Sequence, residues 1–89
     1  MKAIVTVVGK DRVGIIAGVC VKLAEYNINV LDISQTVMQG YFTMMMATDV
    51  SGSTIPLAEL ATVMEEAGKE MGLSIRIQRE DIFEAMHRI

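Results

Sequence analysis

Residues 9–17, Gly-Lys-Asp-Arg-Val-Gly-Ile-Ile-Ala, constrain the fold of this chain more than any other segment, because they separate two apolar segments of different period. The run before them, residues 3–8, is rich in β-branched side chains and is too short for anything but a strand. The apolar positions after the loop recur at helical spacing, at Ile16, Val19, Cys20 and Leu23. The sequence therefore predicts a strand, a tight loop and a helix N-terminus, in that order.

The loop carries residues that suit such a junction. Gly9 and Gly14 allow backbone angles or close approaches that a Cβ would block. Asp11 lies just ahead of the helix, where a carboxylate can accept hydrogen bonds from free backbone N–H groups. The same N–H groups can instead bind an anionic or carboxylate ligand, helped by the helix dipole. On spacing alone, an ordinary helix cap and a ligand site both remain open.

The size and composition of the chain limit it to one domain. With 89 residues, of which 52% are hydrophobic and 21% charged, it can build one core and has no room for a second. The net charge of −3 and the scattered positions of the eight Lys and Arg residues argue against a nucleic-acid partner, whose phosphates require clustered basic side chains. We therefore expect a single domain over residues 1–89 that does not bind nucleic acid directly.

Cys20 is the only cysteine, which excludes an internal disulfide. Its place on the apolar helix stripe predicts a buried core thiol, and a lone thiol is consistent with a reducing cytoplasm. No apolar run approaches the ~20 residues that a membrane span requires, and no charged region precedes a signal-like stretch. We expect a soluble, cytoplasmic protein with no membrane association.

The next segments predict a helix and a hairpin. The first helix is expected over about 13–26, and it stops at Asn27, because Asn tolerates left-handed backbone angles. Strands are expected over 30–38 and 41–50, joined by the tight turn Gln39-Gly40.

A second helix and a last strand follow. Pro56 fits the first turn of that helix, where its missing N–H costs nothing. The apolar positions of the helix repeat at steps of three and four, at Leu57, Leu60, Met64, Ala67 and Met71. Gly72 closes the helix, and residues 73–79 form a strand whose alternating pattern implies one covered face and one wet face.

The order βαββαβ predicts an α+β fold, the ferredoxin-like sandwich, in which a four-stranded antiparallel sheet carries two helices on one face. Its core is expected over about 3–79, and residues 80–89 form a short C-terminal helical tail. In that tail, Asp81 and Glu84 are spaced like a capping-box pair. The apolar residues of the tail lie along one side and need a surface to cover, either this sheet or a neighbouring subunit: Ile82, Phe83, Met86 and Ile89.

From Val5 to Ile77 the chain resembles an ACT domain, a small regulatory module that commonly binds amino acids. Residues 9–17 look like the first strand-to-helix loop of that family, and residues 23–30, Leu-Ala-Glu-Tyr-Asn-Ile-Asn-Val, look like its helix-to-strand junction. A narrower group is indicated by Asp-Ile-Ser-Gln-Thr at 32–36 and Phe-Thr-Met-Met-Met at 42–46. These runs are similar to free-standing bacterial and archaeal single-ACT proteins and to the ACT parts of glycine-cleavage repressor-like regulators.

The resemblance implies a homodimer with a ligand site. In the ACT family two domains commonly pair side by side into an eight-stranded sheet, and effectors bind where the first loop of one subunit meets the second strand of the other. Carried over to this sequence, the candidate ligand-binding residues are Asp11, Arg12, Val13, Gly14, Ile15 and Asn29. Helix N–H groups would receive the carboxylate of an amino acid, while Asp11 or the Asn29 carbonyl accepts from its ammonium. Val13 stands where many ligand-binding members have Pro.

Other groups of residues have ordinary explanations. Met38 and residues 44–46 are more typical of flexible core or interface than of a soft metal site. His87 has no Cys or second His at ligand spacing and is expected at the solvated surface. Asp32 and Asp49 could approach one another across the sheet, but two lone carboxylates are more often surface charges than an acid–base pair. We assign no catalytic residue, no metal and no cofactor.

Two other function classes share the βαββαβ order. RNA-recognition motifs bind through aromatic side chains on the central strands, but Tyr41 and Phe42 are adjacent, lie on opposite faces and lack basic neighbours. An acylphosphatase-like enzyme would use Arg12 in the loop and Asn29 near it, yet the loop resembles the ACT pattern more closely.

A structural dimer module with no ligand remains open, because Asp11, Gly14 and Asn29 also serve ordinary capping and turn roles. The sequence favours a non-enzymatic sensor. Together with the resemblance to the ACT family, it implies a homodimer, formed through a sheet edge, that binds a small molecule, expected to be an amino acid. Ligand occupancy would be transmitted to a separate, unknown partner protein, with no output domain on this chain.

Overall fold

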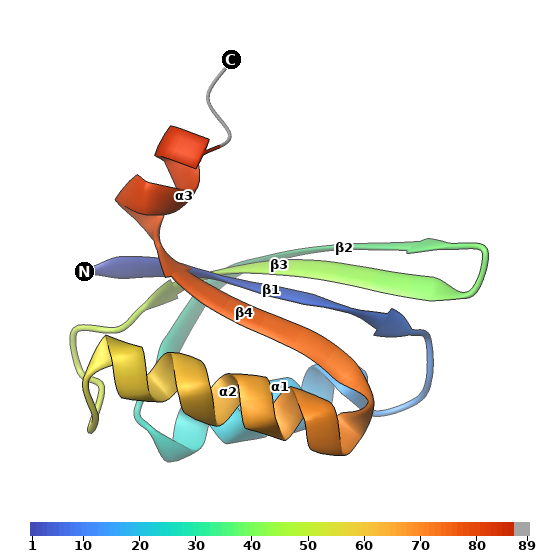
Figure 1. The fold of residues 1–89 in the computed structure, drawn as a ribbon, viewed down its shortest axis with the longest axis horizontal. Coiled ribbons are helices and arrows are strands. Elements are labelled where there is room, and N and C mark those ends of the chain that lie inside the picture. Colours follow the sequence, from blue (N-terminus) through green and yellow to red (C-terminus); the bar gives the residue numbers. More distant parts are fainter. Residues whose placement is uncertain (87–89) are drawn as a thin grey trace.

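In the computed structural model, which describes residues 1–86, four strands form one antiparallel sheet in the order β2-β3-β1-β4 (Figure 1). The elements along the chain are β1 Lys2–Lys10, α1 Ile15–Glu25, β2 Asn29–Met38, β3 Tyr41–Asp49, α2 Leu57–Met71, β4 Leu73–Arg79 and α3 Glu80–Met86. Helices α1 and α2 both lie on one face of the sheet, and α3 extends to the other side. The ferredoxin-like βαββαβ fold with a short C-terminal helix is confirmed.

The core lies between the sheet and the two helices. Alternate residues of strands β1, β3 and β4 point towards the helices and are buried: Ala3, Val5 and Val7, then Phe42, Met44 and Met46, then Leu73, Ile75 and Ile77. The helices contribute Ile15, Val19, Leu23, Leu60 and Met64 to the same cluster. The alternation expected for residues 73–79 is therefore confirmed, and Met44 and Met46 are core residues.

The predicted ends of most elements agree with the backbone. Asn27 follows α1 with φ 61°, and the hairpin turn has φ 52° at Gln39 and φ 83° at Gly40, as a tight turn between two antiparallel strands requires. Gly72 ends α2 with φ 71°, and the last strand has the predicted bounds.

The first helix begins later than predicted. It starts at Ile15 instead of about residue 13, because Gly14 takes φ 92° and occupies the position just before the helix. This left-handed conformation is one that only glycine adopts readily, so the turn extends through Gly14 and the helix follows it.

The edge strand β2 is exposed on both faces. Its register places Ile33, Gln35 and Val37 opposite the buried Met46, Met44 and Phe42, so these β2 side chains point to the helical face of the sheet. They nevertheless remain exposed. The tip of the β2–β3 hairpin extends beyond the ends of the helices (Figure 1). The helical layer of one chain is thus too narrow for its sheet.

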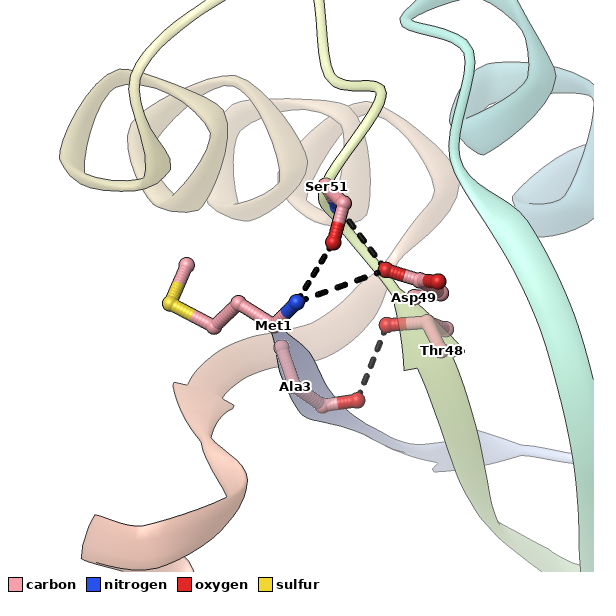
Figure 2. A network of polar contacts seen from close by, with 5 residues as sticks. All are labelled: Met1, Ala3, Thr48, Asp49 and Ser51. Carbon is pink, nitrogen blue, oxygen red and sulfur yellow. Dashed lines mark hydrogen bonds and ion pairs between the residues drawn. The ribbon is translucent and has the colours of Figure 1, made fainter.

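A polar network holds the end of β3 against the start of β1 (Figure 2). The Met1 ammonium donates to the Ser51 hydroxyl and lies 3.6 Å from an Asp49 carboxylate oxygen. The buried Thr48 hydroxyl donates to the Ala3 carbonyl at 2.8 Å. Hydrogen bonds from the backbone N–H and the side chain of Ser51 lower the pKa of Asp49 below its ordinary value of 3.8, and the Met1 ammonium adds to this shift.

The tail forms a helix, but not through the predicted capping box. Asp81 lies inside α3, which begins at Glu80, and its carboxylate accepts from the Ile82 N–H and from Arg79. Ile82 lines a cavity of about 320 Å³ with residues of α2 and β4, so the tail covers part of its own chain. The expectations for His87 and Ile89 lie outside the described residues.

Candidate functional site: a cavity between the first loop and strand β2

The loop that joins β1 to α1 forms one wall of a cavity of about 400 Å³, and the β2–β3 hairpin forms the other. The lining residues are Asp11, Arg12, Gly14, Ile15, Ile16 and Ala17 from the loop and α1, and Gln35, Val37 and Phe42 from the hairpin. The cavity therefore combines one carboxylate and one guanidinium with a largely apolar surface. Its volume lies in the range typical of small-molecule sites.

The structure brings four of the six predicted site residues together on this cavity: Asp11, Arg12, Gly14 and Ile15. The Val13 side chain is fully exposed and does not line the cavity. Asn29 lies opposite Asp49, at the far end of the sheet from the loop, because β2 reaches the loop end only at Met38. Within one chain, Asn29 is therefore separated from the other predicted residues, and only a second copy could bring its own Asn29 to this cavity.

Asp11 does not cap α1, so the first of the two roles that the sequence left open for it is not observed. Gly14 occupies the cap position three residues further on, and among residues 1–86 no side chain forms a cap hydrogen bond at this helix start. The backbone N–H of Asp11 donates to the Gly40 carbonyl at 2.8 Å, which fixes the loop against the hairpin turn. Since its carboxylate is exposed and lines the cavity, it is available to a ligand.

The start of α1 offers backbone donors. The first hydrogen bond of the helix is donated by the Gly18 N–H to the Gly14 carbonyl, so the N–H groups of Ile15, Ile16 and Ala17 precede the helical ladder. No acidic residue lies in the first turn to offset the positive end of the helix dipole. These donors belong to residues that line the cavity, which suits a carboxylate.

Arg12 links the cavity to the second helix. Its guanidinium donates to the Met71 carbonyl, near the end of α2. A cation at that position is favoured by the negative end of the helix dipole. A guanidinium has five N–H donors, and the bond to the Met71 carbonyl uses one of them.

Sequence reasoning missed Gln35, Val37 and Phe42, which form the hairpin wall. The tight turn predicted at Gln39-Gly40 could have identified them, because it determines which residues of the two strands lie opposite each other. Pairing the two strands from that turn places Val37 beside Phe42 and sets both near the end of β1, where the loop begins.

The other groups considered from the sequence do not form a second site. Asp32 lies opposite Ala47, not Asp49, and each carboxylate has its own donor, the Ile33 N–H for Asp32. The sequence predicts a buried core thiol at Cys20, but in the structure Cys20 is half-buried against the core.

Tyr41 and Phe42 lie on opposite faces of the sheet as predicted, with Phe42 buried and Tyr41 exposed. Within residues 1–86, no three His, Cys, Asp or Glu side chains are grouped so that they could hold a metal ion. None of the helices over this range is long and apolar enough to cross a membrane.

The fold and the position of the cavity define a small α+β module of the ferredoxin-like class, with its cavity at the first strand-to-helix loop. The family model described as the ACT domain matches residues 2–78, and the chain belongs to the ACT domain family. The resemblance seen in the sequence is thereby confirmed.

Curated relatives match the chain over its whole length. A UPF0237 protein of Clostridium acetobutylicum is 58% identical over 89 residues, covering 100% of both chains. A UPF0237 protein of the archaeon Methanocaldococcus jannaschii is 48% identical over 88 residues, covering 99% of this chain and 98% of that protein.

Solved structures agree with this assignment. An ACT domain protein from Streptococcus pneumoniae superposes with a TM-score of 0.83 at 49% identity, covering 97% of each chain. A crystal structure assigned as a glycine cleavage system transcriptional repressor has a TM-score of 0.72 at 20% identity, covering 86% of this chain and 44% of that one. The second likeness shows the shared fold, which is the relation to repressor-like regulators that the sequence suggested.

Proposed function

We propose that this chain is a regulatory module that binds a free amino acid in the cavity between the β1–α1 loop and β2, and that it works as a homodimer joined along the β2 edge. The observation that carries the proposal is the lining of the cavity. Asp11, Arg12 and the free N–H groups of α1 lie together there, beside apolar side chains. Arg12 lines the cavity, but Asn29, the second residue that an acylphosphatase-like enzyme would use, lies at the far end of the sheet within one chain, so the proposal is a binding function and not an enzyme.

An amino acid suits these groups because it carries one positive and one negative group on the same carbon. Its carboxylate can accept from Arg12 and from the first N–H groups of α1, with the helix dipole adding a favourable contribution. Its ammonium can donate to the Asp11 carboxylate. A simple anion would use only the contacts to Arg12 and to the N–H groups of α1. It would leave the Asp11 carboxylate without a partner.

The homodimer is supported by the incomplete helical layer. Ile33, Gln35 and Val37 point to the helical face of the sheet but remain partly exposed on their own chain. A second copy placed with its β2 antiparallel to the first would continue the sheet and could cover Ile33 with its α1, leaving Gln35 and Val37 to border the ligand cavity. That arrangement also removes an exposed strand edge, which would otherwise invite uncontrolled association.

The same arrangement explains Asn29. In an antiparallel pair of β2 strands, the start of one strand lies beside the end of the other, so Asn29 of a second copy would approach the loop of the first. The ligand would then contact both copies and favour the dimer, because a ligand that binds one state more tightly shifts the equilibrium toward it. Ligand-favoured association is the signal that a separate protein would read in the cytoplasm.

Sedimentation equilibrium tests the dimer with two matched variants. Ile33 and Met45 are 39% and 38% exposed, but they lie on opposite faces of the sheet. We expect a dimer at micromolar concentration, which Ile33→Lys dissociates and Met45→Lys leaves intact. A monomeric parent protein would contradict the proposal, and so would dissociation by Met45→Lys alone, which would move the interface to the open face of the sheet.

The rival function, a structural dimer without ligand, predicts the same hydrodynamic behaviour but a different response to amino acids. If the proposal is right, a saturating amino acid lowers the dimer dissociation constant, and Asp11→Ala removes that effect. If the module is structural, no amino acid changes the dissociation constant.

A further inference from the structure

We infer that this cavity selects amino acids with an apolar side chain over those with a polar or charged one. The inference rests on the proposed function, since it names the class of amino acid that the same site would bind. It follows from how the lining residues divide between charged and apolar groups.

The charged groups of the cavity match the two charges that every amino acid carries. Asp11 and Arg12 are the only ionisable side chains among its described lining residues. With the ammonium on Asp11 and the carboxylate on Arg12 and the start of α1, the cavity lining that one chain supplies has no further ionisable side chain to pair a charged ligand side chain. A charge buried without a partner is strongly disfavoured, so acidic and basic amino acids are expected to bind poorly.

The rest of the lining is apolar apart from one amide. Ile16 and Ala17 of α1, Val37 of β2 and Phe42 of β3 border the cavity, and Gln35 is the one neutral polar side chain. Phe42 is 3% exposed and forms part of the core, so its position is fixed, whereas Val37 is 53% exposed and presents an accessible apolar flank. A ligand side chain held here would lie against these apolar groups.

Transfer of hydrocarbon from water to such a surface gives about a fourfold gain in affinity for each methylene that becomes buried. We therefore expect affinity to rise from glycine through alanine to valine and leucine. Near-isosteric pairs isolate the polarity of the side chain from its size. Valine should bind at least fivefold more tightly than threonine, and leucine at least tenfold more tightly than asparagine, because the hydroxyl and the amide lose water without gaining partners.

Isothermal titration calorimetry of the full chain with each of the twenty amino acids tests the inference, and the decisive comparisons are valine with threonine and leucine with asparagine. Preference for the apolar member of both pairs supports it. Threonine at least as tight as valine, or asparagine at least as tight as leucine, overturns the selectivity but leaves the proposed sensor function standing. Saturable binding of none of the twenty amino acids refutes the sensor function and the selectivity together.

A matched pair of variants assigns the selectivity to this cavity. Val37→Thr changes one apolar group of the lining to a hydroxyl with little change in shape, and we expect it to reduce leucine affinity about threefold or more. Val21→Thr makes the same change on the exposed surface of α1, outside the cavity, and should leave the affinity unchanged. Equal affinities for leucine in both variants would show that the ligand side chain does not lie against β2.

Discussion

Replacement of Gly14 by alanine separates the backbone role of this residue from its place on the cavity. Gly14 has φ 92°, and a Cβ built on it meets no atom within 4 Å, so the cost of Gly14→Ala comes from the backbone conformation and not from a clash. A left-handed conformation costs a residue with a Cβ about 1–2 kcal/mol. For a domain of this size, each kcal/mol corresponds to a decrease in Tm of about 4–8 °C.

Gly72→Ala is the matched control. Gly72 has φ 71°, its Cβ would also meet nothing within 4 Å, and it lies at the end of α2, outside the lining of the cavity. Urea denaturation should show a similar loss of about 1–2 kcal/mol in the free energy of unfolding for both variants. Only Gly14→Ala should also weaken amino-acid binding, because Gly14 lines the cavity and its altered backbone would move the first N–H groups of α1.

The outcomes are distinct. An unchanged free energy of unfolding in Gly14→Ala would refute the assigned backbone conformation. Equal weakening of binding in both variants would mean that lost stability, and not the cavity, controls binding. Full binding by a destabilised Gly14→Ala protein would remove this part of the loop from the site.

Three further predictions concern stability. Leu60→Ala removes a fully buried side chain and should cost about 2–5 kcal/mol in urea denaturation, whereas Leu31→Ala on the exposed edge strand should cost much less; equal costs would contradict the assigned core. Gly68→Ala places a methyl group 2.8 Å from the Leu73 carbonyl oxygen and 3.0 Å from Ile75 Cγ1, and should destabilise the fold by about 1–3 kcal/mol; no loss would show that α2 can move away from β4. Because the pKa of Asp49 is lowered in the folded protein, its stabilising contribution is present above about pH 3.8 and is lost as the pH falls through the lowered value. Asp49→Asn should therefore be less stable than the parent at pH 6, and this difference should narrow below pH 3.8; a difference that stays constant to pH 2 would contradict the assigned hydrogen bonds.

Most of the fold could be predicted from local sequence patterns, because the residue types within a short segment determine whether it forms a helix, a strand or a turn. The left-handed angles at Asn27, Gly40 and Gly72 are properties of the residue types, and the alternation of residues 73–79 shows directly which side chains are buried. The start of α1 was predicted too early, since Val13 fits a helix by composition and only the backbone angle of Gly14 excludes it.

The site was less predictable, since it joins segments that are distant along the chain. The loop wall was predicted because glycine and aspartate mark it. The hairpin wall was missed, because Gln35 and Val37 acquire their role only from the strand register that places them beside the loop. The position of Asn29 relative to the loop could not be judged from one chain, since its predicted role in ligand binding requires a second copy of the chain.

Calorimetric titration of the parent protein with the twenty amino acids, repeated with Asp11→Ala and Asp32→Ala, tests the central claim most directly. Both aspartates are exposed, but only Asp11 lines the cavity. The account predicts saturable binding of at least one amino acid, weakened by Asp11→Ala and unaffected by Asp32→Ala. Absence of binding to the folded parent protein, or binding that Asp11→Ala leaves intact, would contradict it.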